Sequence, residues 1–126
     1  MKNTILKLFG GYLLILFFLL LSGTSKAQSP CKDNLCVVEF NASWNSANNV
    51  EWLDKVTDCN KLRIVIDENK TTQQQQTDYG IVVVPTIVIF NEGKEVKRFQ
   101  ADISFTMKAT QKEVQEVIDE ILMDAF

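Results

Sequence analysis

Three cysteines are the residues of this sequence best suited to covalent chemistry: Cys31, Cys36 and Cys59. A thiolate can attack a disulfide, and two neighbouring thiols can form one, so such residues serve either redox catalysis or structural cross-linking. The chain contains no histidine. This excludes acid–base catalysis by imidazole and leaves no imidazole ligand for a metal ion, and we predict neither a metal nor a cofactor.

The pairing of the cysteines has two interpretations. Cys36 begins one predicted strand and Cys59 directly precedes the next, so parallel pairing would place both at the same end of a sheet. A structural bridge from Cys59 to Cys36 or to Cys31 is therefore the favoured prediction. The alternative is a redox pair of Cys31 and Cys36. Four intervening residues are not a familiar redox spacing, and no helix begins there to lower the pKa of a thiol.

One carboxylate stands out because of its surroundings. Glu39 lies in the middle of the apolar run Cys-Val-Val-Glu-Phe. A buried carboxylate has to be paired or protonated. We therefore expect Glu39 either to pair with Arg63, on the next predicted strand, or to reach solvent beside the helix that follows.

The hydrophobic pattern predicts the elements that position these residues. Nearly continuous β-branched runs indicate buried strands, and apolar residues three or four apart indicate helices. Asn48 and Glu51 have the spacing of a capping box. The predicted elements are a strand over 36–40, a helix from 48 to about 58, a strand over 62–66, a short solvated helix over 71–79, a hairpin of strands over 86–90 and 95–99, and a helix spanning 114–122.

This order predicts an α/β fold. Two parallel strands joined by a helix, then an antiparallel hairpin and a closing helix, give a mixed four-stranded sheet with helices on both faces. At the N-terminus, an apolar run over 8–21 is followed by Ser25 and Ala27, small residues that fit a cleavage site. We predict a signal peptide over residues 1–27 and one domain over 28–126, periplasmic or secreted. An uncleaved membrane anchor is the alternative.

The charge of the domain limits its partners. Removal of Lys2, Lys7 and Lys26 with the signal peptide changes the formal net charge from −3 to about −6. An acidic surface argues against nucleic acid and anionic lipid as partners.

Several residues, taken in order, resemble the thioredoxin family. Residues 40–44, Phe-Asn-Ala-Ser-Trp, resemble the Phe-x-Ala-x-Trp at the end of a strand in that family. Residues 79–86, Tyr-Gly-Ile-Val-Val-Val-Pro-Thr, resemble the approach to its cis-proline, and Phe90 and Gly93 fall at its hairpin. The resemblance covers 36–122 and implies a thioredoxin-like fold in which the family's usual first strand and helix are absent or reduced to residues 28–36.

The residues after Trp44 depart from that family. Asn45 and Asn48, in Asn-Ser-Ala-Asn, occupy the places of the two cysteines of its Cys-x-x-Cys site. In the family, the first cysteine attacks a substrate disulfide from a helix N-terminus and the second resolves the intermediate. Asparagine can do neither, and Ser46 has no histidine or nearby lysine to activate it. We predict a degenerate, redox-inactive site.

A binding function survives this loss. A cis peptide bond before Pro85, which the resemblance implies, would leave the backbone of Val84 free to pair with an extended peptide. We therefore predict a module that binds a peptide or partner protein through Trp44, Asn45, Val84 and Pro85. The structural alternative is that Pro85 only sets a turn and Trp44 packs on the helix.

Two other functions stay open. One is a thiol–disulfide oxidoreductase that uses Cys31 and Cys36, with or without Cys59, in cell redox homeostasis. The other is a scaffold whose function lies on the irregular segment 102–110.

Overall fold

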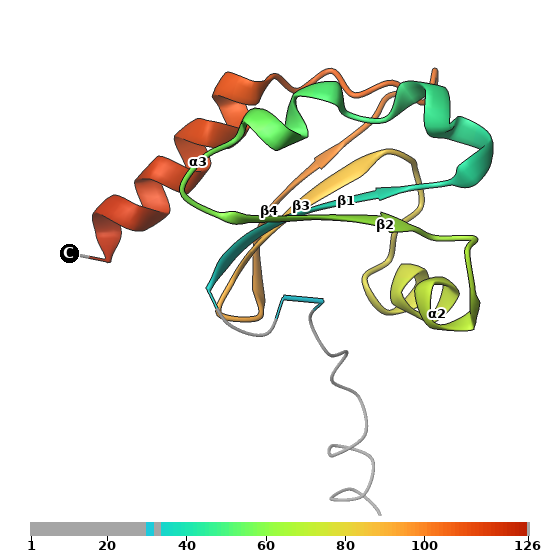
Figure 1. The fold of residues 1–126 in the computed structure, drawn as a ribbon, viewed down its shortest axis with the longest axis horizontal. Helices are drawn as coiled ribbons and strands as arrows, with labels where there is room; N and C mark the ends of the chain where they lie inside the picture. Colours follow the sequence, from blue (N-terminus) through green and yellow to red (C-terminus); the bar gives the residue numbers. More distant parts are fainter. Residues whose placement is uncertain (1–29, 32–33, 126) are drawn as a thin grey trace, which may run out of the picture.

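The computed structural model describes residues 30–31 and 34–125 (Figure 1). The predicted signal peptide over 1–27 and the start of the domain at residue 28 lie outside these residues. In the described part of the chain, no helix is both long enough and apolar enough to cross a membrane.

A mixed four-stranded sheet forms the centre of the fold, with the strand order β2-β1-β3-β4. β1 is parallel to β2 and antiparallel to β3, and β3 is antiparallel to β4. The predicted sheet is therefore confirmed, and each strand lies within two residues of its prediction. The strands are β1 Leu35–Asn41, β2 Asn60–Val65, β3 Thr86–Asn91 and β4 Lys94–Gln100.

Both faces of the sheet are covered, which explains why all seven residues of β1 are buried. The helix α3, Gln111–Asp124, lies with two short 3-10 helices on one face, and α2, Lys70–Asp78, lies on the other (Figure 1). Side chains of β1 alternate between two apolar clusters. The cluster on the α2 side includes Val38, Phe40, Ile64, Val88 and Phe90, and the cluster on the α3 side includes Val37, Leu53, Ile87, Val114 and Ile118.

The helix predicted over 48–58 is wrong in type. The segment instead forms two 3-10 helices, η1 Ser43–Asn48 and η2 Glu51–Lys55. The apolar residues that suggested the helix are spaced three apart, a spacing that fits one face of a 3-10 helix as well as of an α-helix. All of them are buried: Val50, Leu53 and Val56.

The capping box predicted from Asn48 and Glu51 is also absent, because no side chain caps η2 and Asn48 bonds to Asn45 instead. A capping box does occur at the start of α2, where Asn69 and Thr72 exchange side-chain and backbone hydrogen bonds. α2 has no buried residue, as predicted for a solvated helix.

Candidate functional site

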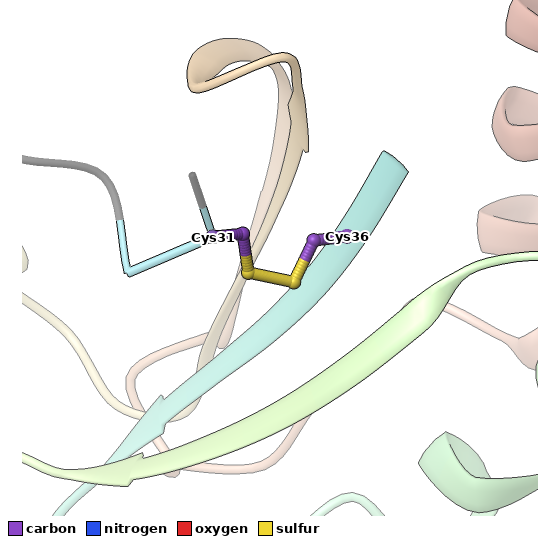
Figure 2. The surroundings of a disulfide bond; sticks show 2 residues. All are labelled: Cys31 and Cys36. Carbon is purple, nitrogen blue, oxygen red and sulfur yellow. A yellow bond between two sulfur atoms is a disulfide. The ribbon is translucent and has the colours of Figure 1, made fainter. Parts of the chain in front are cut away.

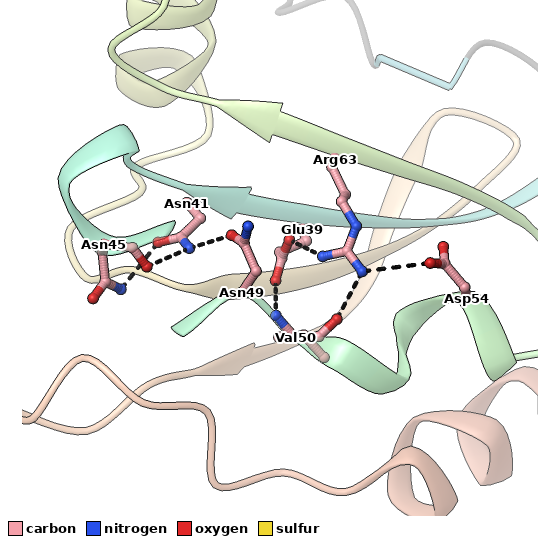
Figure 3. Close-up of polar contacts among 7 residues, drawn as sticks. All are labelled: Glu39, Asn41, Asn45, Asn49, Val50, Asp54 and Arg63. Atoms are coloured by element: carbon pink, nitrogen blue, oxygen red, sulfur yellow. Dashed lines mark hydrogen bonds and ion pairs between the residues drawn. The ribbon is translucent and has the colours of Figure 1, made fainter. Parts of the chain in front are cut away.

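A cluster of hydrogen-bonded asparagines, which includes Asn41, Asn45 and Asn49, lies where η1 follows β1 (Figure 3). The Asn41 Nδ2 group donates to the Asn45 carbonyl oxygen at 3.1 Å and to Asn49 Oδ1 at 2.6 Å. Asn45 Nδ2 returns a bond to Asn41 Oδ1 at 3.0 Å, and Asn48 Nδ2 donates to Asn45 Oδ1 at 2.8 Å. Asn45 therefore holds η1 to β1, and Asn48 braces Asn45 from within η1.

Asn45 also connects η1 to two distant segments. Its Nδ2 group lies 3.1 Å from the carbonyl oxygen of Phe105 and 3.4 Å from that of Val84. The residue is only 6% exposed. Its amide is thus directed inward, whereas the side chain of the preceding residue, Trp44, is 64% exposed.

Next to this cluster, the buried Glu39 carboxylate forms an ion pair with the partly exposed Arg63 (Figure 3). Arg63 Nη1 lies 2.6 Å from Glu39 Oε1, so of the two expectations for Glu39 the ion pair is the one present. Glu39 also accepts a hydrogen bond from the Val50 amide, and Arg63 Nη2 donates to the Val50 carbonyl at 2.8 Å. The ion pair thereby binds both the backbone N–H and the backbone carbonyl of Val50, the residue that precedes η2.

An apolar groove of about 460 Å³ opens beside Trp44. Four separate parts of the chain contribute to it: η1, the β2–α2 connection with α2, the segment before Pro85, and the loop after β4. Trp44 packs edge-to-face on Phe105, with ring centroids 5.2 Å apart. The residues that line the groove include Trp44, Asp67, Gln73, Val82, Val84 and Phe105.

The structure brings the predicted binding residues together, but with different exposures. Trp44 and Val84 both line the groove. Pro85 is buried, its peptide bond with Val84 is cis, and its carbonyl accepts a hydrogen bond from Ala101 at 3.0 Å. Only Trp44 among the predicted set offers a large exposed surface.

Asp67 lies at the rim of the groove and is exposed. It accepts hydrogen bonds from the Ser43 hydroxyl and, at 2.9 Å, from the Ser43 amide. These bonds, led by that of the hydroxyl, lower the pKa of Asp67. The side chain is therefore a fixed negative charge next to Trp44.

The loop after β4 is folded around a second carboxylate, Asp102. This group accepts hydrogen bonds from the Ser104 amide at 2.9 Å and from the Ser104 hydroxyl, and it lies 3.5 Å from Lys108 Nζ. The hydroxyl bond is the main reason that the pKa of Asp102 falls to about 2. The loop holds Phe105, which has a positive φ of 60°, against Trp44.

The Asp102 contacts predict a change in acid stability. Because folding lowers the pKa of Asp102 from its ordinary value of 3.8 to about 2, its contribution to stability is present above about pH 4 and is lost as the pH falls towards 2. In an Asp102→Asn variant, the midpoint of thermal unfolding should fall less steeply between pH 4 and pH 2. Glu116→Gln, an exposed change on α3, is the control and should leave the profile unaltered. Identical profiles for Asp102→Asn and the wild type would contradict this.

The cysteine pairing differs from the favoured prediction. Cys31 and Cys36 form a disulfide, with Cα atoms 6.1 Å apart, and Cys59 is free (Figure 2). The bridge predicted from Cys59 is wrong because β1 residue Cys36 is in register with Asn60, so Cys59 lies on the other face of the sheet. Cys36 packs in the cluster on the α2 side and Cys59 against the cluster on the α3 side.

The free thiol gives a second prediction. Burial raises the pKa of Cys59, since the nearby Lys61 only partly offsets it. We expect iodoacetamide to alkylate Cys59 of the native protein several-fold more slowly than it alkylates free cysteine at pH 8, and at the normal rate in denaturant. Mass spectrometry of modified peptides should find Cys31 and Cys36 unmodified before reduction. Alkylation of Cys31 or Cys36 in the unreduced protein would contradict the pairing.

Among residues 30–31 and 34–125, no group of three or more cysteine, aspartate or glutamate side chains is placed to hold a metal ion. No protein-family model and no curated protein matches the sequence.

The fold does match solved structures of thioredoxins. A thioredoxin variant from Halobacterium salinarum NRC-1 is 25% identical, with a TM-score of 0.54 over 70% of this chain and 74% of that one. The thioredoxin of Fasciola hepatica is 28% identical, with a TM-score of 0.51 over 71% and 82%. That of Schistosoma mansoni is 20% identical, with a TM-score of 0.52 over 72% and 80%. The chain therefore has a thioredoxin-like fold, and its disulfide lies outside the Asn-Ser-Ala-Asn positions.

Two residues of the site were not singled out from the sequence. Asp67 directly follows a predicted strand, a place where side chains often line a site at a sheet edge. Phe105 is an aromatic residue in a segment with no predicted element, which was a usable signal for a surface role. Neither signal indicates that the two residues lie beside Trp44.

Proposed function

We propose that this chain is an extracytoplasmic binding module that holds an extended segment of a partner protein in the groove beside Trp44. The observation that carries the proposal is the contrast between neighbours: Trp44 is 64% exposed at the groove wall, whereas Asn45 is buried and bonded inward. The site therefore retains an apolar contact surface and has lost the nucleophile. Aromatic residues are enriched at protein interfaces, and tryptophan is among their most frequent anchors.

Other exposed apolar groups extend the surface around Trp44. Val82 is 81% exposed and Phe105 is 40% exposed, and both line the same groove as Trp44. Clustered exposed apolar side chains of this size mark interaction sites more often than single ones do. The segment 102–110, which the sequence left as a separate candidate, thus supplies one wall of the same groove.

A selection experiment tests the proposal. Random linear 12-residue peptides displayed on phage would be selected on the purified protein, and the enriched peptides would be synthesised and their Kd values measured. We expect Trp44→Ala to weaken these peptides by at least about 30-fold, as for an aromatic anchor. Val82→Lys should also weaken them, whereas Val96→Lys, on the exposed part of β4, should not. Failure to obtain any peptide that depends on Trp44 and Val82 would refute the proposal.

The disulfide supports a second candidate function, thiol–disulfide exchange at Cys31 and Cys36. Cys36 is 1% exposed, so an attacking thiolate would have to reach the half-buried Cys31. This function predicts insulin reduction that disappears in Cys31→Ser, and a bridge that opens between roughly −120 and −270 mV. A bridge that resists reduction below about −300 mV would mark it as structural.

A further inference from the structure

We infer that the partner segment carries a basic side chain beside an apolar one, and that Asp67 selects the basic group. The inference rests on the proposed binding function and specifies the chemistry of the ligand. It follows from the charge of the groove rather than from its apolar walls.

The first step is that the Asp67 carboxylate is held in place next to η1, the helix that carries Trp44. Asp67 is fixed by two hydrogen bonds to Ser43, and Ser43 is the neighbour of Trp44 in η1. The carboxylate therefore keeps its place relative to the indole ring. A ligand that contacts Trp44 therefore enters a groove whose lining includes this negative charge.

The second step is that the protein itself leaves this charge unneutralised. None of the residues that line the groove is basic. Among the residues that the structure describes, ion pairs are formed by other acids only, namely Glu39, Asp54, Glu95 and Asp102. Asp67 is thus available to a cation from outside, and a like charge brought to the same place would be repelled.

The third step is that a lysine or arginine side chain can contact both the apolar residues of the groove and the Asp67 carboxylate. The aliphatic part of either side chain can lie along apolar surface while its charged end remains at a polar rim. Here Trp44 and Val82 provide the apolar surface and Asp67 the acceptor. A cation over the face of a tryptophan gains a further attraction. In an extended peptide, the residue two positions away points to the same side and can contact Phe105.

The same phage selection, sequenced deeply, tests this inference. On the wild type, lysine and arginine should be enriched at one position, with an aromatic or aliphatic residue two positions away. Selection on Asp67→Asn should lose the basic preference but keep the apolar one, and Asp67→Lys should favour acidic peptides. Glu68→Gln removes a neighbouring exposed acid outside the groove and should leave the preference intact.

Affinities of the enriched basic peptides give the quantitative test. Asp67→Asn should weaken them two- to fivefold, the range of an exposed ion pair, and should remove most of their salt dependence. Asp67→Glu should keep the salt dependence. Trp44-dependent peptides without a basic preference, or with one unchanged in Asp67→Asn, would overturn the inference and leave the binding function standing. Absence of any Trp44-dependent peptide would overturn both.

Discussion

An Arg63→Met variant should lose about 3 kcal/mol of unfolding free energy, because it leaves the buried carboxylate of Glu39 without its partner. Glu39 is 1% exposed, and Arg63 is the only cation within ion-pairing distance of it among the described residues. The Arg63 side chain is one third exposed, which places the effect at the lower end of the range for broken buried pairs. Urea titration followed by circular dichroism would measure the loss.

Two companion variants isolate the cause of this loss. Lys61→Met removes a cation two residues earlier on β2, one that contacts only backbone carbonyls, and should cost about 1 kcal/mol or less. The double variant Glu39→Gln/Arg63→Met keeps an acceptor for the Val50 amide but buries no charge. It should recover more than half of the lost stability. Equal stability of Arg63→Met and the double variant would show that the unpaired charge is not the cause.

Asn45→Ala should cost about 2 kcal/mol, because it removes the amide that joins η1, β1 and the loop after β4. The buried Oδ1 atom of Asn41 and the carbonyl of Phe105 would each lose a donor. The loop should then hold Phe105 less firmly against Trp44, so a change in tryptophan fluorescence should accompany the loss of stability.

Asn48→Ala provides the matched control for this change. Asn48 is half-buried and donates a single side-chain bond, to Asn45, so its loss should cost at least about 1 kcal/mol less. Equal destabilisation by the two substitutions would contradict a central role for Asn45. The comparison also tests whether the two asparagines have the same structural role.

Most of the sheet could be predicted because its strands are short, almost continuous apolar runs. The nearly continuous apolar sequences of β1 and β3 reflect the burial of these strands on both faces of the sheet, and such sequences predict a strand without reference to the rest of the chain. The helical type of residues 48–58 could not be predicted in the same way. Three apolar residues spaced three apart fit one face of either helix, so the spacing alone does not distinguish the two types.

The cysteine pairing and the groove depend on information that is not local. Strand order alone placed Cys36 and Cys59 at one end of the sheet, but the faces on which they lie depend on the register of β1 and β2. Trp44 could be singled out as a candidate from its place after the predicted strand. Its neighbours Phe105 and Asp67 come from segments 61 and 23 residues away, and only the folded chain shows that they meet.

The division of the groove among four segments has a thermodynamic consequence. No single fragment of the chain contains the groove, so a ligand that enters it can bind the folded state but not the unfolded one. At a free concentration 100 times its Kd, such a ligand would raise the unfolding free energy by about 2.7 kcal/mol. Thermal shift in the presence of candidate partners would therefore report occupancy without any label, and the shift should vanish in Trp44→Ala.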